Sequence, residues 1–213
     1  PPRLGVGNGR LPEPNQMTVR IEPKPGTRMR LWAKRAGVEE FVTLGEPVEM
    51  LAGDPGAAAA ILRETYAKLE PMGERGYLST SAALLAHALY AQNELDEAER
   101  FTRLSEDAAA SEDVFSQVLW RAVRSKIRAR RGELIEAEAL GREAVALVEK
   151  TDMLNTQGDT LADFAEVLSL AGRPAEAISV LEQAAELFTR KGNRVSLERV
   201  RALARELAPA GPA

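Results

Sequence analysis

Few side chains in this chain could do chemistry, and its composition excludes several kinds of active site. Its 213 residues include no cysteine and a single histidine, His87. This excludes a thiolate nucleophile, a disulfide and a zinc site built from several histidines. No Gly-x-x-x-x-Gly-Lys-Ser/Thr loop for nucleotide phosphates occurs anywhere. The sequence therefore predicts no catalytic residue, no metal ion and no cofactor.

His87 is the first candidate for a general base, because histidine titrates near neutral pH. A general base needs a nucleophile or another partner, and the neighbours of His87 at helical spacing are Thr80, Ala83 and Tyr90. These neighbours complete no catalytic set. We therefore favour a structural role for His87, or a place in the lining of a binding groove, with catalysis as the minor alternative.

A second candidate is the basic stretch over residues 121–131. Arg121, Arg124 and Arg128 share one helical face there, as a helix that binds phosphate or an acidic peptide would require. Two interpretations remain: a surface for an acidic protein partner, or counter-ions for nearby glutamates that also suit the helix dipole. Nucleic acid is disfavoured, because residues 46–213 carry 20 basic against 28 acidic side chains.

One pattern organises most of the chain: a turn residue followed five places later by alanine. The turn residues are Gly53, Asn93, Gly132 and Gly172. The alanines, spaced by 40, 39 and 40 residues, are Ala58, Ala98, Ala137 and Ala177. Glycine or asparagine ends a helix in the left-handed conformation, and a small alanine lets the next helix pack closely. A fixed period of this length is typical of stacked helical repeats.

Apolar residues recur at helical spacing between these turns. They predict an all-α right-handed solenoid over residues 45–207, built of three complete helix pairs, a preceding half-repeat and a capping helix. The expected helices include 54–70, 78–92, 95–109 and 194–207.

The middle pair is expected to contain one extra residue. Ile127 lies five residues before its turn glycine, whereas Leu89 and Leu168 lie four residues before their turn residues. An insertion in the first helix or in the turn would account for this difference. We therefore align the middle helix on its apolar residues rather than on its turn.

Residues 1–44 have a different character from the repeats. They carry 8 basic against 4 acidic residues, and six of the twelve prolines lie within the first 25 positions. Alternation at Thr18–Glu22 and Arg28–Trp32 is compatible with a weak hairpin, which is marginal in isolation. We expect residues 1–44 to be a disordered or weakly ordered tail, and residues 208–213 to be a second, short tail.

Nothing in the sequence indicates a membrane. No stretch approaches ~18 consecutive apolar residues, and no basic region at the N-terminus leads into an apolar run. We expect a cytoplasmic location.

Three strings around the recurring turns resemble the centre of tetratricopeptide repeats: Asn93–Glu99, Gly132–Glu138 and Gly172–Ala177. Their period exceeds the usual 34 residues of that family and is closer to long-helix variants in bacterial signalling proteins. The resemblance implies a helical solenoid that binds a protein or peptide.

A narrower resemblance rests on Gly76–Thr80, Ser116–Arg121, Thr151–Asp152 and Lys191–Asn193, in that order. These motifs are similar to the C-terminal repeat region of large bacterial proteins that join a class III adenylate/guanylate cyclase, an AAA-type ATPase and repeats. The resemblance implies a regulatory scaffold in signal transduction. The alternative is a C-terminal fragment of such a cyclase or ATP-binding regulator.

In proteins of this resemblance the first helix of each pair lines the concave groove. Adding the basic stripe gives the predicted partner-binding residues: Thr80, His87, Tyr90, Arg121, Arg124, Ser125, Arg128, Asp159 and Glu166. The expected partner is a protein or peptide, and the arginines leave an acidic one open.

Overall fold

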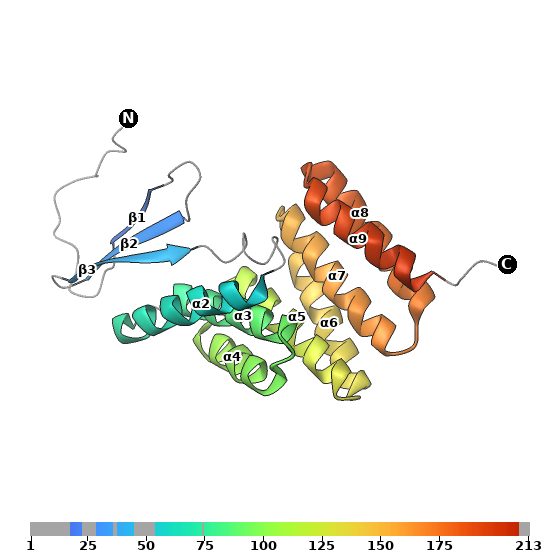
Figure 1. Ribbon diagram of the computed structural model, residues 1–213, viewed down its shortest axis with the longest axis horizontal. Helices are drawn as coiled ribbons and strands as arrows, with labels where there is room; N and C mark the ends of the chain where they lie inside the picture. The colour runs from blue at the N-terminus through green and yellow to red at the C-terminus, as the bar shows by residue number, and fades with distance from the viewer. Residues whose placement is uncertain (1–17, 23–28, 36–37, 45–53, 74, 209–213) are drawn as a thin grey trace. The chain divides into compact units, whose positions relative to one another are not determined.

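The computed structural model describes residues 18–22, 29–35, 38–44, 54–73 and 75–208. The chain separates into two compact units, Pro1–Gly45 and Glu46–Ala213. Each unit is described by itself (Figure 1).

The first unit contains an antiparallel sheet of three strands. The strands are β1 (Thr18–Glu22), β2 (Met29–Arg35) and β3 (Val38–Leu44), in the order β1-β2-β3. The pairing of β1 with β2 matches the hairpin considered in the sequence. The strand β3 was not expected, and it pairs with β2 from Met29–Leu44 to Arg35–Val38. A third strand matters because two strands alone are marginally stable.

The second unit is an all-α, tetratricopeptide-like solenoid, as predicted. Helices pack as the antiparallel pairs α3–α4, α5–α6 and α7–α8, and each second helix also contacts the first helix that follows. The helix α2 is the half-repeat and α9 is the cap. The bounds are α2 Pro55–Leu69, a 3₁₀ turn Glu70–Met72, α3 Arg75–Ala91, α4 Leu95–Ala108, α5 Val114–Arg130, α6 Leu134–Val148, α7 Leu154–Leu170, α8 Pro174–Lys191 and α9 Arg194–Leu207.

The turns within the pairs have the predicted chemistry. Asn93, Gly132 and Gly172 have φ of 65°, 80° and 74°, which is the left-handed conformation that glycine and asparagine accept most readily. The alanines that follow, Ala98 and Ala137 among them, are fully buried. Each turn therefore reverses the chain tightly enough for the paired helices to touch.

The prediction of an extra residue in the middle pair is wrong. The helices α3, α5 and α7 each contain 17 residues and each ends two residues before its left-handed turn residue. In this register Ile127 aligns with Ala88 and Val167. Arg128 then stands where α3 has the buried Leu89. The apolar residues of α5 are therefore shifted along the helix relative to those of α3 and α7, whereas the three helices have the same length.

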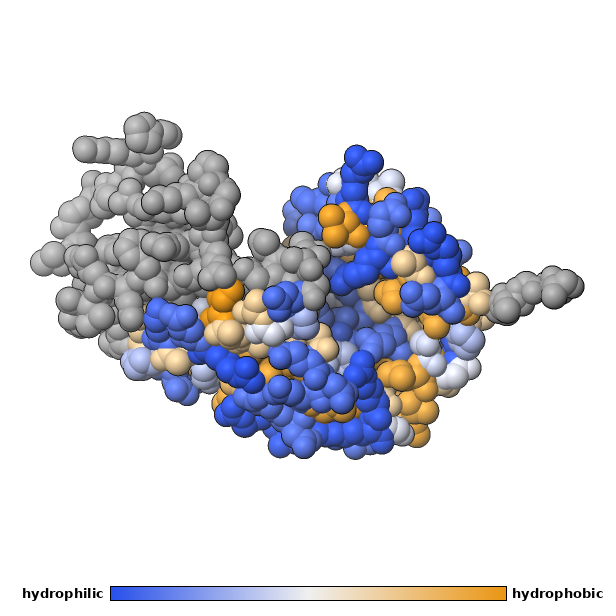
Figure 2. Space-filling view, in the orientation of Figure 1, coloured by the Kyte–Doolittle hydropathy of each residue, from blue (hydrophilic) through white to orange (hydrophobic). Residues whose placement is uncertain are grey.

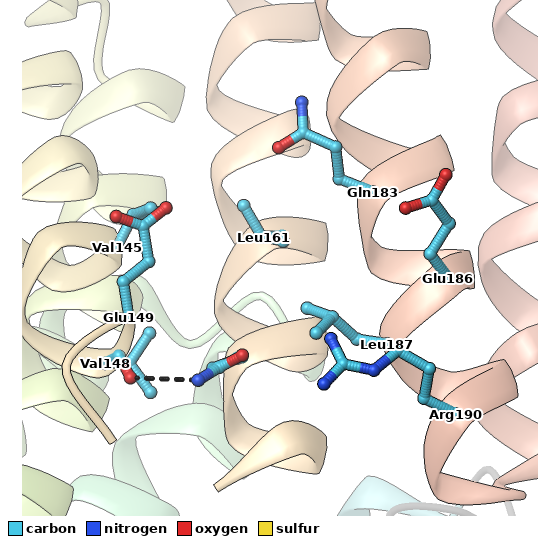
Figure 3. Close-up of a pocket in the computed structure, with 9 residues that line it drawn as sticks. Val145, Val148, Glu149, Leu161, Gln183, Glu186, Leu187 and Arg190 are labelled. Carbon is cyan, nitrogen blue, oxygen red and sulfur yellow. Dashed lines mark hydrogen bonds between the residues drawn. The ribbon is translucent and has the colours of Figure 1, made fainter. Parts of the chain in front are cut away.

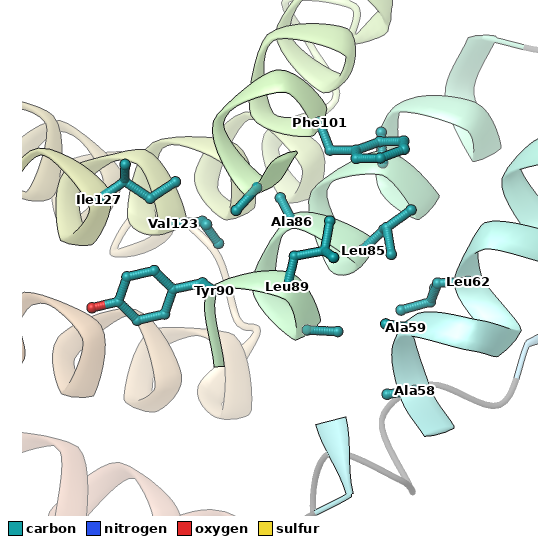
Figure 4. Close-up of a cluster of buried hydrophobic side chains, with 13 residues drawn as sticks. Ala58, Ala59, Leu62, Leu85, Ala86, Leu89, Tyr90, Phe101, Val123 and Ile127 are labelled. Atoms are coloured by element: carbon teal, nitrogen blue, oxygen red, sulfur yellow. The ribbon is translucent and has the colours of Figure 1, made fainter. Parts of the chain in front are cut away.

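The core is aliphatic with a few aromatic rings. In the N-terminal half, Leu62 of α2 packs with Leu85 and Leu89 of α3 and with Phe101 of α4 (Figure 4). The ring of Phe101 also meets Tyr66 edge to face at a centroid distance of 5.3 Å. Since α2 closes this cluster, the half-repeat is part of the folded core.

The helix α9 closes the other end of the stack with a polar outer side. It begins 40 residues after α7, so it corresponds to the first helix of a pair. Where α7 has the buried Gly158 and Ala165, α9 has Glu198 and Arg205, which are exposed. Terminal elements of solenoids need such a polar surface.

Candidate partner-binding face

The first helices α3, α5 and α7 lie next to one another and are followed by α9. We call the side of this layer that faces away from the second helices the concave face. Figure 2 shows a mostly hydrophilic surface over the second helix α4, on the other side of this layer.

A buried lysine organises the centre of the concave face. Lys126 of α5 has a side chain that is 3% exposed, and its Nζ lies 2.6 Å from Asp163 Oδ1 and 4.0 Å from Glu166 Oε2 on α7. The same Nζ lies 4.5 Å from the centre of the Tyr90 ring on α3. A buried cation is tolerated only when it is paired in this way.

Direct contacts also join α3 to α7 across α5. The hydroxyl of Tyr90 donates to Glu166 Oε1 at 2.5 Å, and Arg130 Nη2 lies 3.3 Å from the same oxygen. His87 Nε2 lies 4.0 Å from Asp163 Oδ1. These residues and Lys126 form one network, the central polar cluster, which consists of His87, Tyr90, Lys126, Arg130, Asp163 and Glu166.

Burial and neighbouring charges fix the protonation states in the central polar cluster. Burial, reinforced by the charge of Lys126, lowers the pKa of His87 to about 4, so this histidine is neutral at pH 7. Burial alone would raise the pKa of Asp163, but the charge of Lys126 holds that pKa below its usual value. Burial and the charge of Glu166 raise the pKa of Tyr90. Tyr90 is therefore a neutral donor and Asp163 a carboxylate.

A separate ion pair connects α7 to the capping helix. Asp159 Oδ1 lies 2.7 Å from Arg199 Nη2, and both side chains are about half exposed, at 50% and 46%. Partial removal of the carboxyl group from water raises the pKa of Asp159, and the charge of Arg199 opposes this shift. This pair extends the concave face from α7 onto α9.

The structure brings only part of the predicted set together. His87, Tyr90 and Glu166 lie in the central polar cluster, and Asp159 lies beside it on α7. Thr80 lies near the start of α3, where its Oγ1 is 2.8 Å from the hydroxyl oxygen of a buried serine of α5.

Ser125 does not have the predicted exposure. It is 0% exposed, and its hydroxyl donates to the backbone oxygen of Ala122 at 2.7 Å. The error follows from the assumed insertion, because alignment on the turns places Lys126, not Ser125, in register with His87 and Glu166.

The basic stripe faces the second helices rather than the concave face. Arg121 pairs with a glutamate of α6 at 3.2 Å and Arg124 with one of α4 at 2.6 Å, and both guanidinium groups stack on Trp120, at 4.1 and 4.4 Å. Arg128 pairs with Glu99 at 2.9 Å. These contacts fit the interpretation as counter-ions; binding of a partner by the stripe stays a prediction.

Four charged residues of the concave face were missed: Lys126, Arg130, Asp163 and Arg199. The signal that finds Lys126 is the constant length of the first helices, counted back from the left-handed residue. Arg130, Asp163 and Arg199 have no equally specific signal, since charged residues on a helix are most often solvated.

Within the described residues, no group of three or more histidine, cysteine, aspartate or glutamate side chains could hold a metal ion. The described helices include none that is long and apolar enough to cross a membrane.

No family model matches the chain, and no curated protein matches it. Two solved structures that match it come from one protein of Podospora anserina, assigned as a kinesin light chain with nearly identical tetratricopeptide-like repeats, and from a variant of that protein. Each shows 16% identity, covers 76% of this chain and 90% of the other, and has a TM-score of 0.44. At that score the assignment of the fold rests on the helix pairs, turns and register described above.

Proposed function

We propose that the helical unit is a non-catalytic module that binds a protein or peptide partner on its concave face. The observation that carries this proposal is an exposed stripe on α9. Val195 and Leu203 are 59% and 39% exposed, and they flank Arg199 at four-residue spacing. Because Arg199 bonds Asp159 of α7, the stripe borders the concave face. Exposed apolar side chains beside charged ones are typical of interaction surfaces.

The protonation states support binding rather than catalysis. His87 is neutral and stays neutral until the pH falls to about 4, so it is poorly matched to accept a proton near pH 7. The cation of Lys126 is held by Asp163 at 2.6 Å. The central polar cluster is thus engaged in joining helices of the stack.

Site-specific crosslinking tests the proposal. A photo-crosslinking amino acid at Val195 is expected to capture a protein partner in the native lysate. The same group at Ile135, which is 91% exposed on α6, is the control and is expected to capture much less. With the captured partner purified, the double variant Val195→Asp and Leu203→Asp is expected to raise the Kd at least tenfold, whereas Ile135→Asp leaves it unchanged. Equal capture at both positions would contradict the proposal.

The resemblance of residues 45–207 to bacterial cyclase–ATPase–repeat proteins supports a more specific role for this module. That role is a cytoplasmic scaffold that regulates a signalling enzyme. The second candidate is that the chain is the C-terminal part of such a cyclase or ATP-binding regulator, and the same motifs favour it. Coding sequence for cyclase and ATPase domains directly upstream would support the second candidate. The chain itself is expected to form no cyclic nucleotide and to hydrolyse no ATP.

A further inference from the structure

A cleft among α6, α7 and α8 lies outside the concave face (Figure 3). Its volume is about 230 Å³. Its floor is apolar and consists of Val145, Val148, Leu161 and Leu187. Its rim is polar and consists of Glu149, Gln157, Gln183, Glu186 and Arg190. Glu149 stands on one side of the cleft and Glu186 and Arg190 on the other.

The rim carries two carboxylates and one guanidinium group. Glu149, Glu186 and Arg190 form no ion pair with any residue in the described part of the chain, which leaves a net charge of −1 at the cleft. The side-chain nitrogen of Gln157 donates to two backbone oxygens, at 2.8 and 3.3 Å. Its Oε1 accepts no hydrogen bond from the described residues. A polar acceptor above an apolar floor suits a ligand with an aliphatic stem and a cationic head.

A glutamine is held by similar contacts one repeat earlier, between α5 and the end of α4. Counted from the first residue of each helix, Gln117 of α5 corresponds to Gln157 of α7, and Arg121 corresponds to Leu161. The side-chain nitrogen of Gln117 also donates to two backbone oxygens, at the end of α4, at 3.0 and 3.5 Å. The two glutamines are therefore held by the same kind of contact.

In the earlier repeat an arginine of the chain itself, Arg121, donates to the glutamine oxygen. Nη1 of Arg121 donates to Gln117 Oε1 at 2.6 Å, and its Nε donates to Glu143 Oε2 at 3.2 Å. In the last repeat Leu161 replaces the arginine and has no group that could donate. No hydrogen bond from the described residues reaches the oxygen of Gln157, so this oxygen is open to a donor.

We propose that the cleft receives an arginine side chain of a protein partner, in the place that Arg121 fills one repeat earlier. This inference rests on the proposed function and specifies the chemistry of the partner. The guanidinium donates to Gln157 Oε1, its stem lies on the apolar floor, and Glu149 and Glu186 supply negative charge. Arginine fits better than lysine, because its planar fork serves an amide oxygen and a carboxylate together.

Titration of the isotope-labelled full chain with N-acetylarginine methylamide tests the cleft without a partner. We expect saturable NMR shifts of the Gln157 side-chain amide and of the Leu161 and Leu187 methyl groups, with a Kd on the order of 1–10 mM for so small a ligand. The citrulline analogue, which is neutral and of the same shape, is expected to cause no saturable shift. The lysine analogue is expected to bind at least threefold more weakly. Equal shifts with citrulline, or none with arginine, would overturn the inference.

The variant Leu161→Arg reproduces the earlier repeat and is expected to fill the cleft. It should abolish the response to the arginine amide, whereas Leu161→Met, of similar volume, should keep it. The exposed double variant Glu149→Lys and Glu186→Lys leaves the apolar floor intact and is expected to weaken binding at least tenfold. Retained binding in this double variant, or in folded Leu161→Arg, would overturn the inference.

A partner captured at Val195 separates the inference from the proposed function. If that partner binds with unchanged Kd to the Leu161→Arg and Glu149→Lys/Glu186→Lys variants, the inference fails and the proposed function stands. If the arginine amide binds in the cleft while no partner is captured, the proposed function fails, and with it the assignment of a protein as the source of the arginine.

Discussion

The side chain of Lys126 shows how one buried charge holds three helices. It pairs with Asp163 on α7 and lies over the Tyr90 ring of α3. We expect Lys126→Met to reduce the free energy of unfolding by about 3–5 kcal/mol, because Asp163 is left without its cation. Urea denaturation measures this loss, and Lys126→Met with Asp163→Asn should recover part of it.

The matched control is Lys68 of α2, which pairs with Glu64 at the surface at 2.8 Å and is 32% exposed. An exposed pair of this kind contributes at most about 1 kcal/mol, so Lys68→Met is expected to change stability by no more than that. Equal losses for the two lysine variants would show that the pairing of Lys126 has no special weight.

His87 makes the stability depend on pH in a predictable direction. Its pKa is about 4 in the folded protein, below the ordinary 6.5. The unfolded chain therefore binds the proton first, and stability is lost as the pH falls from about 6.5 towards 4. His87→Gln is expected to remove this part of the loss, seen as a smaller difference between urea midpoints at pH 7 and pH 5.

The same residue permits a direct measurement, since it is the only histidine. Its ring proton signals in NMR are expected to titrate near pH 4. A titration midpoint near 6.5 would show that His87 is solvated in the folded protein, and the pH argument would fail.

At the scale of the element, the contact between α7 and α8 depends on the absence of a side chain at Gly158. A Cβ built there would lie 2.6 Å from the ring of Phe188, which is fully buried. Alanine normally favours a helix by about 1 kcal/mol over glycine. We expect the opposite sign for Gly158→Ala, a net loss of about 1–2 kcal/mol in thermal or urea unfolding, because the ring must move.

Gly56 of α2 is the control for this substitution. A Cβ at that position would meet its nearest atom, Asp54 Oδ1, at 3.5 Å, which is ordinary contact. Gly56→Ala is therefore expected to leave stability unchanged or slightly raised. A gain at Gly158 similar to that at Gly56 would mean that the ring of Phe188 relaxes without cost.

The helices themselves could be predicted well, because each carries a local signal. Left-handed residues such as Asn93 and Gly132 mark the turns, and Ala98 and Ala137 mark the close contacts. The register of α5 could not be found from apolar residues alone. Its Arg128 occupies a position that is leucine in the neighbouring first helices. This arginine forms an ion pair with Glu99 of α4.

The concave face was predicted less well, because it depends on contacts between residues far apart in the sequence. His87 and Glu166 were predicted from their places on first helices, and the structure places both in the central polar cluster. Asp163 acquires its role only through Lys126, 37 residues away, and no local pattern reports such a pairing. The strand Val38–Leu44 was missed for a similar reason, since its partner β2 decides whether it forms.

For the whole molecule, the boundary between the tail and the repeats gives a fourth prediction. We expect deletion of residues 1–44 to leave the Tm of the helical unit nearly unchanged, because Pro1–Gly45 and Glu46–Ala213 are separate compact units. Deletion of residues 1–72 should lower the Tm by roughly 5 °C or more, because it removes α2, whose Ala58 and Leu62 are buried in the core. Circular dichroism during heating measures both.

A large decrease in the Tm after the first deletion would place residues 1–44 within the cooperative unit and would contradict the predicted boundary. An unchanged Tm after the second deletion would instead mean that α3 needs no cover on its α2 side.

The hydrogen bond from Tyr90 of α3 to Glu166 of α7 also bears on how a partner would bind. The curvature of a solenoid changes when the distance between alternate first helices changes. Here the hydrogen bond from Tyr90 to Glu166 resists a change in that distance. We therefore expect the central helices α3, α5 and α7 to keep their spacing better than the terminal helices α2 and α9. A rigid concave face loses little conformational entropy on binding. We therefore expect a complementary partner to dock as a rigid body, at a rate set by diffusion and orientation.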